Sequence, residues 1–263
     1  MASYKNIILQ KKGKTAILTI NREDKLNAVN RSTFLEISQA FDQMGTDDAI
    51  AGVIITGQGD KSFVAGADIQ EFNGISSDEA FEMCSWVQQQ VMDKIEAFGK
   101  PVVAAINGYA LGGGLELAMA CHIRLAVRQA KMGLPEVSLG LIPGYGGTQR
   151  LTYLVGRAKA LEMILSADMI DAEQAERCGL VNYVMDSREA LIEKALDILD
   201  RIYLRSSIAV SHAIRAVNMS ALGSTEQGYD AEKSLFSACF KTEDLKEGID
   251  AFINKRKPNF RGR

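Results

Sequence analysis

The sequence contains little of what metal-dependent and disulfide-bonded proteins require. Only two histidines occur among its 263 residues, His122 and His212, and neither has a partner at metal-ligand spacing. The four cysteines are far apart and form no CxxC motif, which is typical of reduced thiols rather than of a disulfide framework or a zinc site. We therefore expect no metal, and we expect any acid–base chemistry to use carboxylates rather than histidine.

Long apolar runs and a strong net charge are missing as well. No apolar stretch reaches the ~18 residues of a membrane span, and residues 1–10 lack the basic and then apolar pattern of a signal peptide. The formal net charge of −3 disfavours a nucleic-acid partner, because such binding depends on basic side chains that contact phosphates. The composition, 47% hydrophobic and 24% charged, excludes a disordered chain. These features predict a cytoplasmic protein that binds neither a membrane nor a nucleic acid.

Strand-like and helical patterns alternate along the first two-thirds of the chain. Runs rich in β-branched residues predict strands at 7–9, 15–20, 51–56, 101–106 and 123–127, the first two forming a hairpin. Apolar residues at three- and four-residue steps predict helices, which we place after residue 30 and at 76–98, 115–121, 149–155, 158–166, 172–178, 188–203 and over most of 226–257. This order predicts an α/β core followed by a helical C-terminal region.

Two of these helices carry a capping signature at their start. Ser76 and Glu79 fit a capping box before the long helix at 76–98, and Thr33 and Glu36 fit one before the first helix. In a capping box the hydroxyl and the acid each bind a backbone N–H of the first turn, so we expect both pairs to fix where their helices begin.

A glycine-rich stretch at 107–118 is the first candidate for a functional site. A strand ends there, small residues follow, and a helix begins at the triple glycine 112–114. Glycine lets backbone N–H groups approach a ligand, and a helix N-terminus adds unpaired donors that suit an oxyanion. Glu116 lies in the first turn of this helix, where its carboxylate can face the same space. Close packing of helix on strand, with Glu116 favourable to the helix dipole, explains the same pattern without a function.

A second stretch, at 134–148, places Glu136 after a proline and among apolar neighbours. Partial burial there would favour the protonated acid, although a salt-bridged loop acid fits the position equally well. The glycines of this stretch form no nucleotide-binding motif, because GxxxxGK[ST] is absent and residues 144–147 lack the third glycine of GxGxxG. A third stretch, at 63–69, is by itself only a turn of small residues.

Together, in their order and spacing, the three stretches resemble the crotonase (enoyl-CoA hydratase) family, especially its bacterial short-chain members. Further matches lie at residues 17–28, 147–151, 179–181 and 251–257, so the resemblance covers nearly the whole chain. The activity that it implies is the reversible syn addition of water to a trans-2-enoyl-CoA, such as crotonyl-CoA, which gives a 3-hydroxyacyl-CoA.

The resemblance also implies an architecture. Residues 1–195 would form a crotonase-like α/β spiral of ββα units that contains the active site. Residues 196–263 would form a helical region through which subunits assemble as a homotrimer, or as a homohexamer that is a dimer of trimers.

The resemblance assigns a role to each matching site residue. Glu116 and Glu136 would be the catalytic pair, with Glu116 activating water and Glu136 protonating the α-carbon. The backbone N–H groups of Ala67 and Gly113 would form the oxyanion hole for the thioester carbonyl. No separate cofactor is implied, because coenzyme A is part of the substrate. The residues implied to bind the substrate, the last two from a neighbouring subunit, are Leu26, Ala65, Gly66, Asp68, Ile69, Gln70, Gly112, Gly144, Phe252 and Lys255.

Some positions depart from the family pattern. Gln70 stands where lysine is frequent, which puts a charged contact with coenzyme A in doubt. His122 stands where aspartate is frequent, and we interpret it as structural. Two alternatives are a Δ3,Δ2-enoyl-CoA isomerase of the same fold and a non-catalytic binder of CoA esters or RNA. Because isomerases can work with one carboxylate, the presence of both Glu116 and Glu136 favours hydration.

Overall fold

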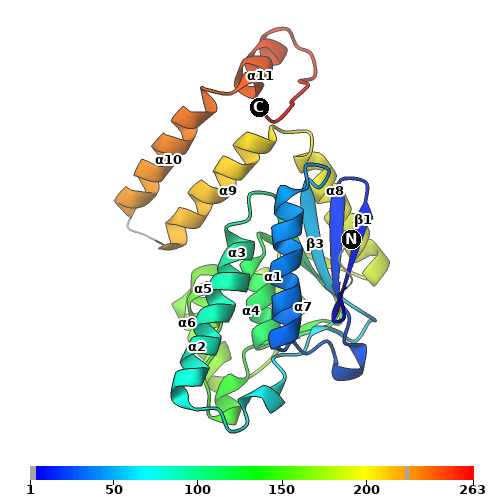
Figure 1. Ribbon diagram of the computed structural model, residues 1–263, viewed down its shortest axis with the longest axis vertical. Helices are drawn as coiled ribbons and strands as arrows, with labels where there is room; N and C mark the ends of the chain where they lie inside the picture. Colours follow the sequence, from blue (N-terminus) through cyan, green and yellow to red (C-terminus); the bar gives the residue numbers. More distant parts are fainter. Residues whose placement is uncertain (1–3, 223–224) are drawn as a thin grey trace.

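The computed structural model describes residues 4–222 and 225–263. The fold is built on two β-sheets (Figure 1). The larger sheet has the strand order β1-β2-β3-β5-β7-β10, with β1 and β2 antiparallel and the other neighbours parallel. The smaller sheet has the order β4-β6-β8-β9, and its last pair is antiparallel. The strands are Ile7–Lys12 (β1), Thr15–Ile20 (β2), Gly52–Gly57 (β3), Ser62–Val64 (β4), Val102–Ile106 (β5), Tyr109–Leu111 (β6), Ile123–Val127 (β7), Lys131–Gly133 (β8), Ile170–Asp171 (β9) and Tyr183–Met185 (β10).

The chain winds between the two sheets as a spiral of ββα units. Each of β3, β5 and β7 in the larger sheet is followed by a short strand of the smaller sheet, and helices then return the chain to the larger sheet. This confirms the predicted fold class. The helices are Arg31–Thr46 (α1), Ser77–Val87 (α2), Asp93–Glu96 (α3), Gly113–Ala120 (α4), Gly147–Val155 (α5), Arg157–Ser166 (α6), Ala172–Arg177 (α7), Arg188–Ile202 (α8), Ser207–Leu222 (α9), Thr225–Cys239 (α10) and Glu243–Ile253 (α11).

The starts of α1 and α2 test the two predicted capping boxes. The box at Ser76 and Glu79 is confirmed, with both of its reciprocal bonds present. The box at Thr33 and Glu36 is wrong, because α1 begins three residues earlier at the stronger cap Asn30, whose Oδ1 accepts a hydrogen bond from Thr33 N at 2.9 Å. Glu36 instead accepts bonds from the segment before β1.

The helix predicted at 76–98 is continuous, but part of it is π-helical rather than α-helical. A π-helical turn, Gln88–Met92, separates α2 from α3. Val87, Val91 and Ile95 are buried on the core side. The apolar face of the helix is therefore continuous, although the π-turn holds one residue more than an α-helical turn. This turn lies directly behind the candidate site described below.

The C-terminal helices differ from the rest of the chain in their surroundings. Figure 1 shows α9, α10 and α11 projecting beyond one end of the sheets, whereas α8 packs against β5 and β7. Residues 195 and 196 both lie within α8, and the division of the chain at that point stays a prediction. Among residues 4–222 and 225–263, no helix combines the length and the apolar character that a membrane crossing needs.

Candidate active site

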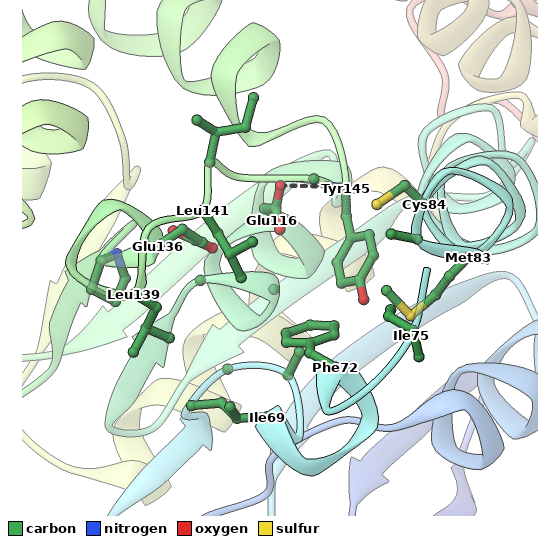
Figure 2. Close-up of a pocket in the computed structure, with 18 of the residues that line it drawn as sticks. Ile69, Phe72, Ile75, Met83, Cys84, Glu116, Glu136, Leu139, Leu141 and Tyr145 are labelled. Carbon is green, nitrogen blue, oxygen red and sulfur yellow. Dashed lines mark hydrogen bonds between the residues drawn. The ribbon is translucent and has the colours of Figure 1, made fainter. Parts of the chain in front are cut away.

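One cavity brings residues of all three glycine-rich stretches together. It has a volume of about 360 Å³. Figure 2 shows the carboxyl groups of Glu116 and Glu136 pointing into it, with the rings of Phe72 and Tyr145 beside them. The residues that line it from these stretches are Ala65, Gly66, Ala67, Ile69, Leu111, Gly112, Gly113, Glu116, Pro135, Glu136, Leu139, Leu141, Ile142, Gly144 and Tyr145.

The start of α4 depends on glycine because the backbone is crowded there. Gly112 has φ +50° and ψ −126°, a conformation open to glycine but costly for other residues. A Cβ on Gly114 would lie 2.1 Å from the carbonyl oxygen of Val64, so glycine is required for α4 to approach β4 this closely. The same approach brings the first turn of α4 beside the loop that follows β4.

Two backbone amides are thereby placed at the cavity. Ala67 and Gly113 both line it, and a Cβ on Gly113 would lie 3.7 Å from Ala67 N. Within the described part of the chain, neither amide donates a hydrogen bond, while Asp68 N next to Ala67 donates to Val29 O at 2.8 Å. Two free donors at one wall, one of them at a helix N-terminus, suit an oxygen that gains negative charge.

Glu116 projects from the first turn of α4 and is 1% exposed. Its Oε1 accepts hydrogen bonds from the backbone N–H groups of Tyr145 and Gly147, each at 2.8 Å. Burial raises the pKa of Glu116 to about 7, and the charge of Glu136 adds to the rise, while the two amides and Arg150 oppose it. The acid is therefore poised near neutrality, with one oxygen held and the other available to the cavity.

Glu136 begins the 3-10 turn Glu136–Leu139 and is half-buried. Its Oε2 is buried and has no hydrogen-bond partner among the described residues. Its other oxygen lies beside the start of α4, since a Cβ on Gly112 would come within 2.7 Å of it. Burial raises the pKa of Glu136, so the protonated acid is favoured and a cavity ligand can take its free oxygen as donor or acceptor.

The chain has relatives among known proteins. A family model described as enoyl-CoA hydratase/isomerase matches residues 10–263. The chain belongs to this family. It is 47% identical over 258 residues to a crotonyl-CoA hydratase of Syntrophomonas wolfei, with 98% of each chain covered, and 43% identical over 252 residues to a short-chain-enoyl-CoA hydratase of Clostridium acetobutylicum, with 96% of each covered. The crystal structure of enoyl-CoA hydratase from Bacillus anthracis superposes with a TM-score of 0.91 at 35% identity, covering 98% of this chain and 100% of that one.

Not every residue that the enoyl-CoA hydratase/isomerase resemblance assigned to substrate reaches this cavity. Leu26, Asp68 and Gln70 lie beside it rather than in its wall: Leu26 is 43% exposed, Asp68 pairs with Arg22 at 3.2 Å, and Gln70 is exposed. Phe252, on α11 and 86% exposed, and Lys255, just beyond α11, are far along the chain from the cavity wall. Their contact with coenzyme A in a neighbouring subunit stays a prediction.

Several residues that shape the site were not singled out from the sequence. The amides of Tyr145 and Gly147 hold Glu116, and the guanidinium of Arg150 donates to Tyr145 O at 3.1 Å. The only signal for them was that the glycine run 144–147 stands directly before a helix, as the triple glycine of α4 does. That parallel is typical of a loop whose backbone amides are used.

Two interpretations concerning metals and histidine can be compared with the structure. His122 is structural: its Nδ1 accepts a hydrogen bond from Val102 N at 3.0 Å, and its Nε2 lies 3.0 Å from Glu96 O. Across residues 4–222 and 225–263, His, Cys, Asp and Glu side chains nowhere gather as three that could hold a metal ion. The absence of a cofactor stays a prediction.

Proposed function

We propose that this protein is an enoyl-CoA hydratase that adds water reversibly to a short-chain trans-2-enoyl-CoA such as crotonyl-CoA, giving the 3-hydroxyacyl-CoA. The observation that carries the proposal is the shared cavity: two glutamates of unlike surroundings face it beside two amides with no partner in the described chain. Its relatives are named for this reaction, and the chain covers nearly their full length.

The amides of Ala67 and Gly113 activate the thioester in this proposal. When water attacks the β-carbon, negative charge develops on the carbonyl oxygen of the thioester. Two fixed N–H donors stabilise that charge without having to reorganise, and the loss of one such donor typically costs ~10²–10³ in rate. Neither amide has a hydrogen-bond partner in the described part of the chain, which supports this role.

The two glutamates divide the proton transfers. Glu116, whose carboxylate form is favoured by two amide bonds, takes a proton from water as the water oxygen bonds to the β-carbon. Glu136, whose pKa burial raises, gives a proton to the α-carbon. The pair holds one proton before and after the reaction, and solvent exchange restores its starting arrangement. Because the acids interact, they titrate as a pair.

The cavity also supports a short acyl group. Tyr145 is buried, and its ring packs edge-on against Phe34 with 5.4 Å between centroids. It lines both this site and a neighbouring cavity that Phe34 and Trp86 also line, and Ile75 and Met83 lie in the wall of both. A fixed aromatic wall at this point limits how far an acyl chain extends. Ala65, Gly66 and Ile69 line the same cavity and would contact coenzyme A, which enters as part of the substrate.

Assembly and location complete the proposal. We infer a homotrimer or homohexamer formed through the C-terminal helices, supported by the exposed apolar side chains Phe236, Phe240, Phe252 and Ile253 on α10, α11 and the turn between them. Light scattering on the purified protein would give the subunit number.

A cytoplasmic location is supported by the four free thiols.

The decisive assay follows crotonyl-CoA with the purified protein. Hydration removes the conjugated double bond, so the ultraviolet absorbance of the thioester falls and 3-hydroxybutyryl-CoA forms. A Δ3,Δ2-isomerase would instead convert a 3-enoyl-CoA to the conjugated ester and consume no water. Absence of 3-hydroxyacyl product from four-carbon and longer trans-2-enoyl-CoA substrates would overturn the proposal.

A further inference from the structure

The loop of residues 144–147 separates two cavities. Its front faces the catalytic cavity, where Tyr145 N and Gly147 N hold Glu116. Its back faces a second cavity of about 390 Å³, whose lining includes Gln88, Gly146 and Arg150. Side chains at the back can therefore control the loop without touching a substrate at the front.

Gln88 makes such a contact. Its Nε2 donates a hydrogen bond to Gly144 O at 2.7 Å. That carbonyl and the N–H of Tyr145 belong to one planar trans peptide unit, so they point in opposite directions. Fixing the carbonyl toward Gln88 aims the N–H toward Glu116, where it donates to Oε1 at 2.8 Å.

The π-helical turn presents Gln88 to the loop. Gln88 opens the turn and is half-buried, whereas Gln89 and Gln90, next in the chain, are exposed. π-turns are rare and are frequently found at functional sites. The turn therefore places one glutamine in contact with the loop of residues 144–147, called the catalytic loop below, and leaves the next two exposed.

We propose that Gln88 is a positioning residue for the hydration reaction, acting on Glu116 through the peptide unit that joins Gly144 to Tyr145. This role rests on the proposed function, because it matters only if Glu116 transfers a proton. Arg150 adds a second restraint on the next peptide unit through Tyr145 O, and Arg150 is itself fixed by Glu96 at 2.7 Å and Asp93 at 2.8 Å.

The charge around Glu116 makes the proposal testable by titration. The titratable and charged groups that interact with Glu116 are Glu136 from the 3-10 turn, Arg150 from α5, Cys84 from α2 and Tyr145 from the loop. Gln88 is neutral, so replacing it with Met changes none of these charges. Any change in the titration of Glu116 then reports the amide donor, whose hydrogen bond lowers the pKa of this acid.

The test compares Gln88→Met with Gln89→Met and Gln90→Met. We expect Gln88→Met to lower kcat about tenfold, as for a lost hydrogen bond to a charged group, with KM changed less than about twofold. The limb of the pH profile that requires ionised Glu116 should move to higher pH by about half a unit. The two control variants should match the wild type in kcat and in pH profile.

A second readout does not need catalysis. Infrared titration of protein carrying 13C-labelled glutamate, with Glu116→Gln to identify the band, follows the protonation of Glu116 directly. The same upward shift in Gln88→Met supports the action of Gln88 on Glu116 independently of turnover, so a failure of this contact and a failure of the proposed function can be told apart. An unchanged titration of Glu116 in Gln88→Met overturns it. If Gln88→Met does not fold, Gln88→Asn, which keeps the amide but is one methylene too short, decides by the same two measurements.

Discussion

The start of α4 and the 3-10 turn Glu136–Leu139 each carry one glutamate to the cavity, yet they surround it differently. At α4, Glu116 is nearly fully buried and two backbone amides hold one of its oxygens. At the 3-10 turn, Glu136 is half-buried and its Oε2 has no partner among the described residues. The same residue type thereby meets two fixed backbone donors in one place and leaves an oxygen without a partner in the other.

The difference teaches that fixed backbone donors, and not charged neighbours alone, distinguish the two acids. The amides that hold Glu116 come from the loop before α5 and carry no charge to be screened. Among the described residues no such pair of amides reaches Glu136, whose pKa is raised by burial and lowered by its own backbone amide. Removing either acid, or displacing it, should therefore have measurable results.

Removing the acids should have the largest effect. Glu116→Gln and Glu136→Gln each keep the shape of the side chain but remove its proton transfer, so we expect kcat on crotonyl-CoA to fall by ~10²–10⁴. Steady-state kinetics would check this, with thermal unfolding as the control for folding. Near wild-type turnover in either variant would contradict the assignment of that acid.

Displacing each acid without removing it should lower kcat on crotonyl-CoA about 10²-fold. A Cβ on Gly147 would lie 2.8 Å from Glu116 Oε1, and a Cβ on Gly112 would lie 2.7 Å from Glu136 Oε1. Gly147→Ala should therefore disturb Glu116, and Gly112→Ala should disturb Glu136 and also strain a backbone with φ +50°. Gly228→Ala, where the added methyl meets nothing within 4 Å, is the matched control. Full activity in both site variants would show that the acids tolerate displacement.

The raised pKa of Glu116 has a consequence for stability. The unfolded chain releases this proton near pH ~4.3, and the folded chain releases it near about 7, so the folded state binds the proton more tightly. Its contribution is present below the unfolded value and is lost as the pH rises through 7. Relative to Glu116→Gln, the wild type should lose roughly 2–3 kcal/mol of unfolding free energy between about pH 5 and pH 8.

Denaturant unfolding of both proteins across this range would measure the loss. Glu82→Gln, at an exposed position on α2, is the control for the substitution itself. A difference between wild type and Glu116→Gln that stays constant with pH would contradict the placement of the Glu116 titration.

The smallest expected effect concerns Tyr145, which lines both the catalytic cavity and the neighbouring one. Tyr145→Ala should open the catalytic cavity toward the space beside Phe34 and Trp86, because the largest side chain in the wall that the two cavities share is lost. We expect the ratio of kcat/KM for an eight-carbon to a four-carbon enoyl-CoA to rise about tenfold. Tyr145→Phe keeps the wall and should keep the wild-type ratio. An unchanged ratio in Tyr145→Ala would place the limit on acyl length elsewhere.

Much of the fold could be predicted because its longer elements have strong periodicity. The hairpin of β1 and β2, the strands β3, β5 and β7, and most helices lie within a few residues of their predicted positions. The strands β4, β6 and β8 have only three residues each, too few to show an alternating pattern, so the smaller sheet came from the family resemblance alone. The helix α1 begins after residue 30 as predicted, but its cap is Asn30 rather than the predicted Thr33.

The candidate site, like the fold, could be predicted from the sequence only in part. Glu116 and Glu136 could be identified because each stands in a distinctive local sequence. Gln88 and the amides of Tyr145 and Gly147 could not, because their contacts join segments that are distant in the chain: Gly147 N and Glu116 are 31 positions apart, and Gln88 and Gly144 are 56. Only packing brings such segments together.

The π-helical turn also bears on how this chain should be compared with its relatives. It holds one residue more than regular α-helical winding would, and each residue of an α-helix advances about 100° around the axis. Because Val91 and Ile95 anchor the following side in the core, deleting one residue here would swing Gln88 away from the loop. A single-residue gap at this point of an alignment would therefore mark family members that must fix the catalytic loop with a different donor.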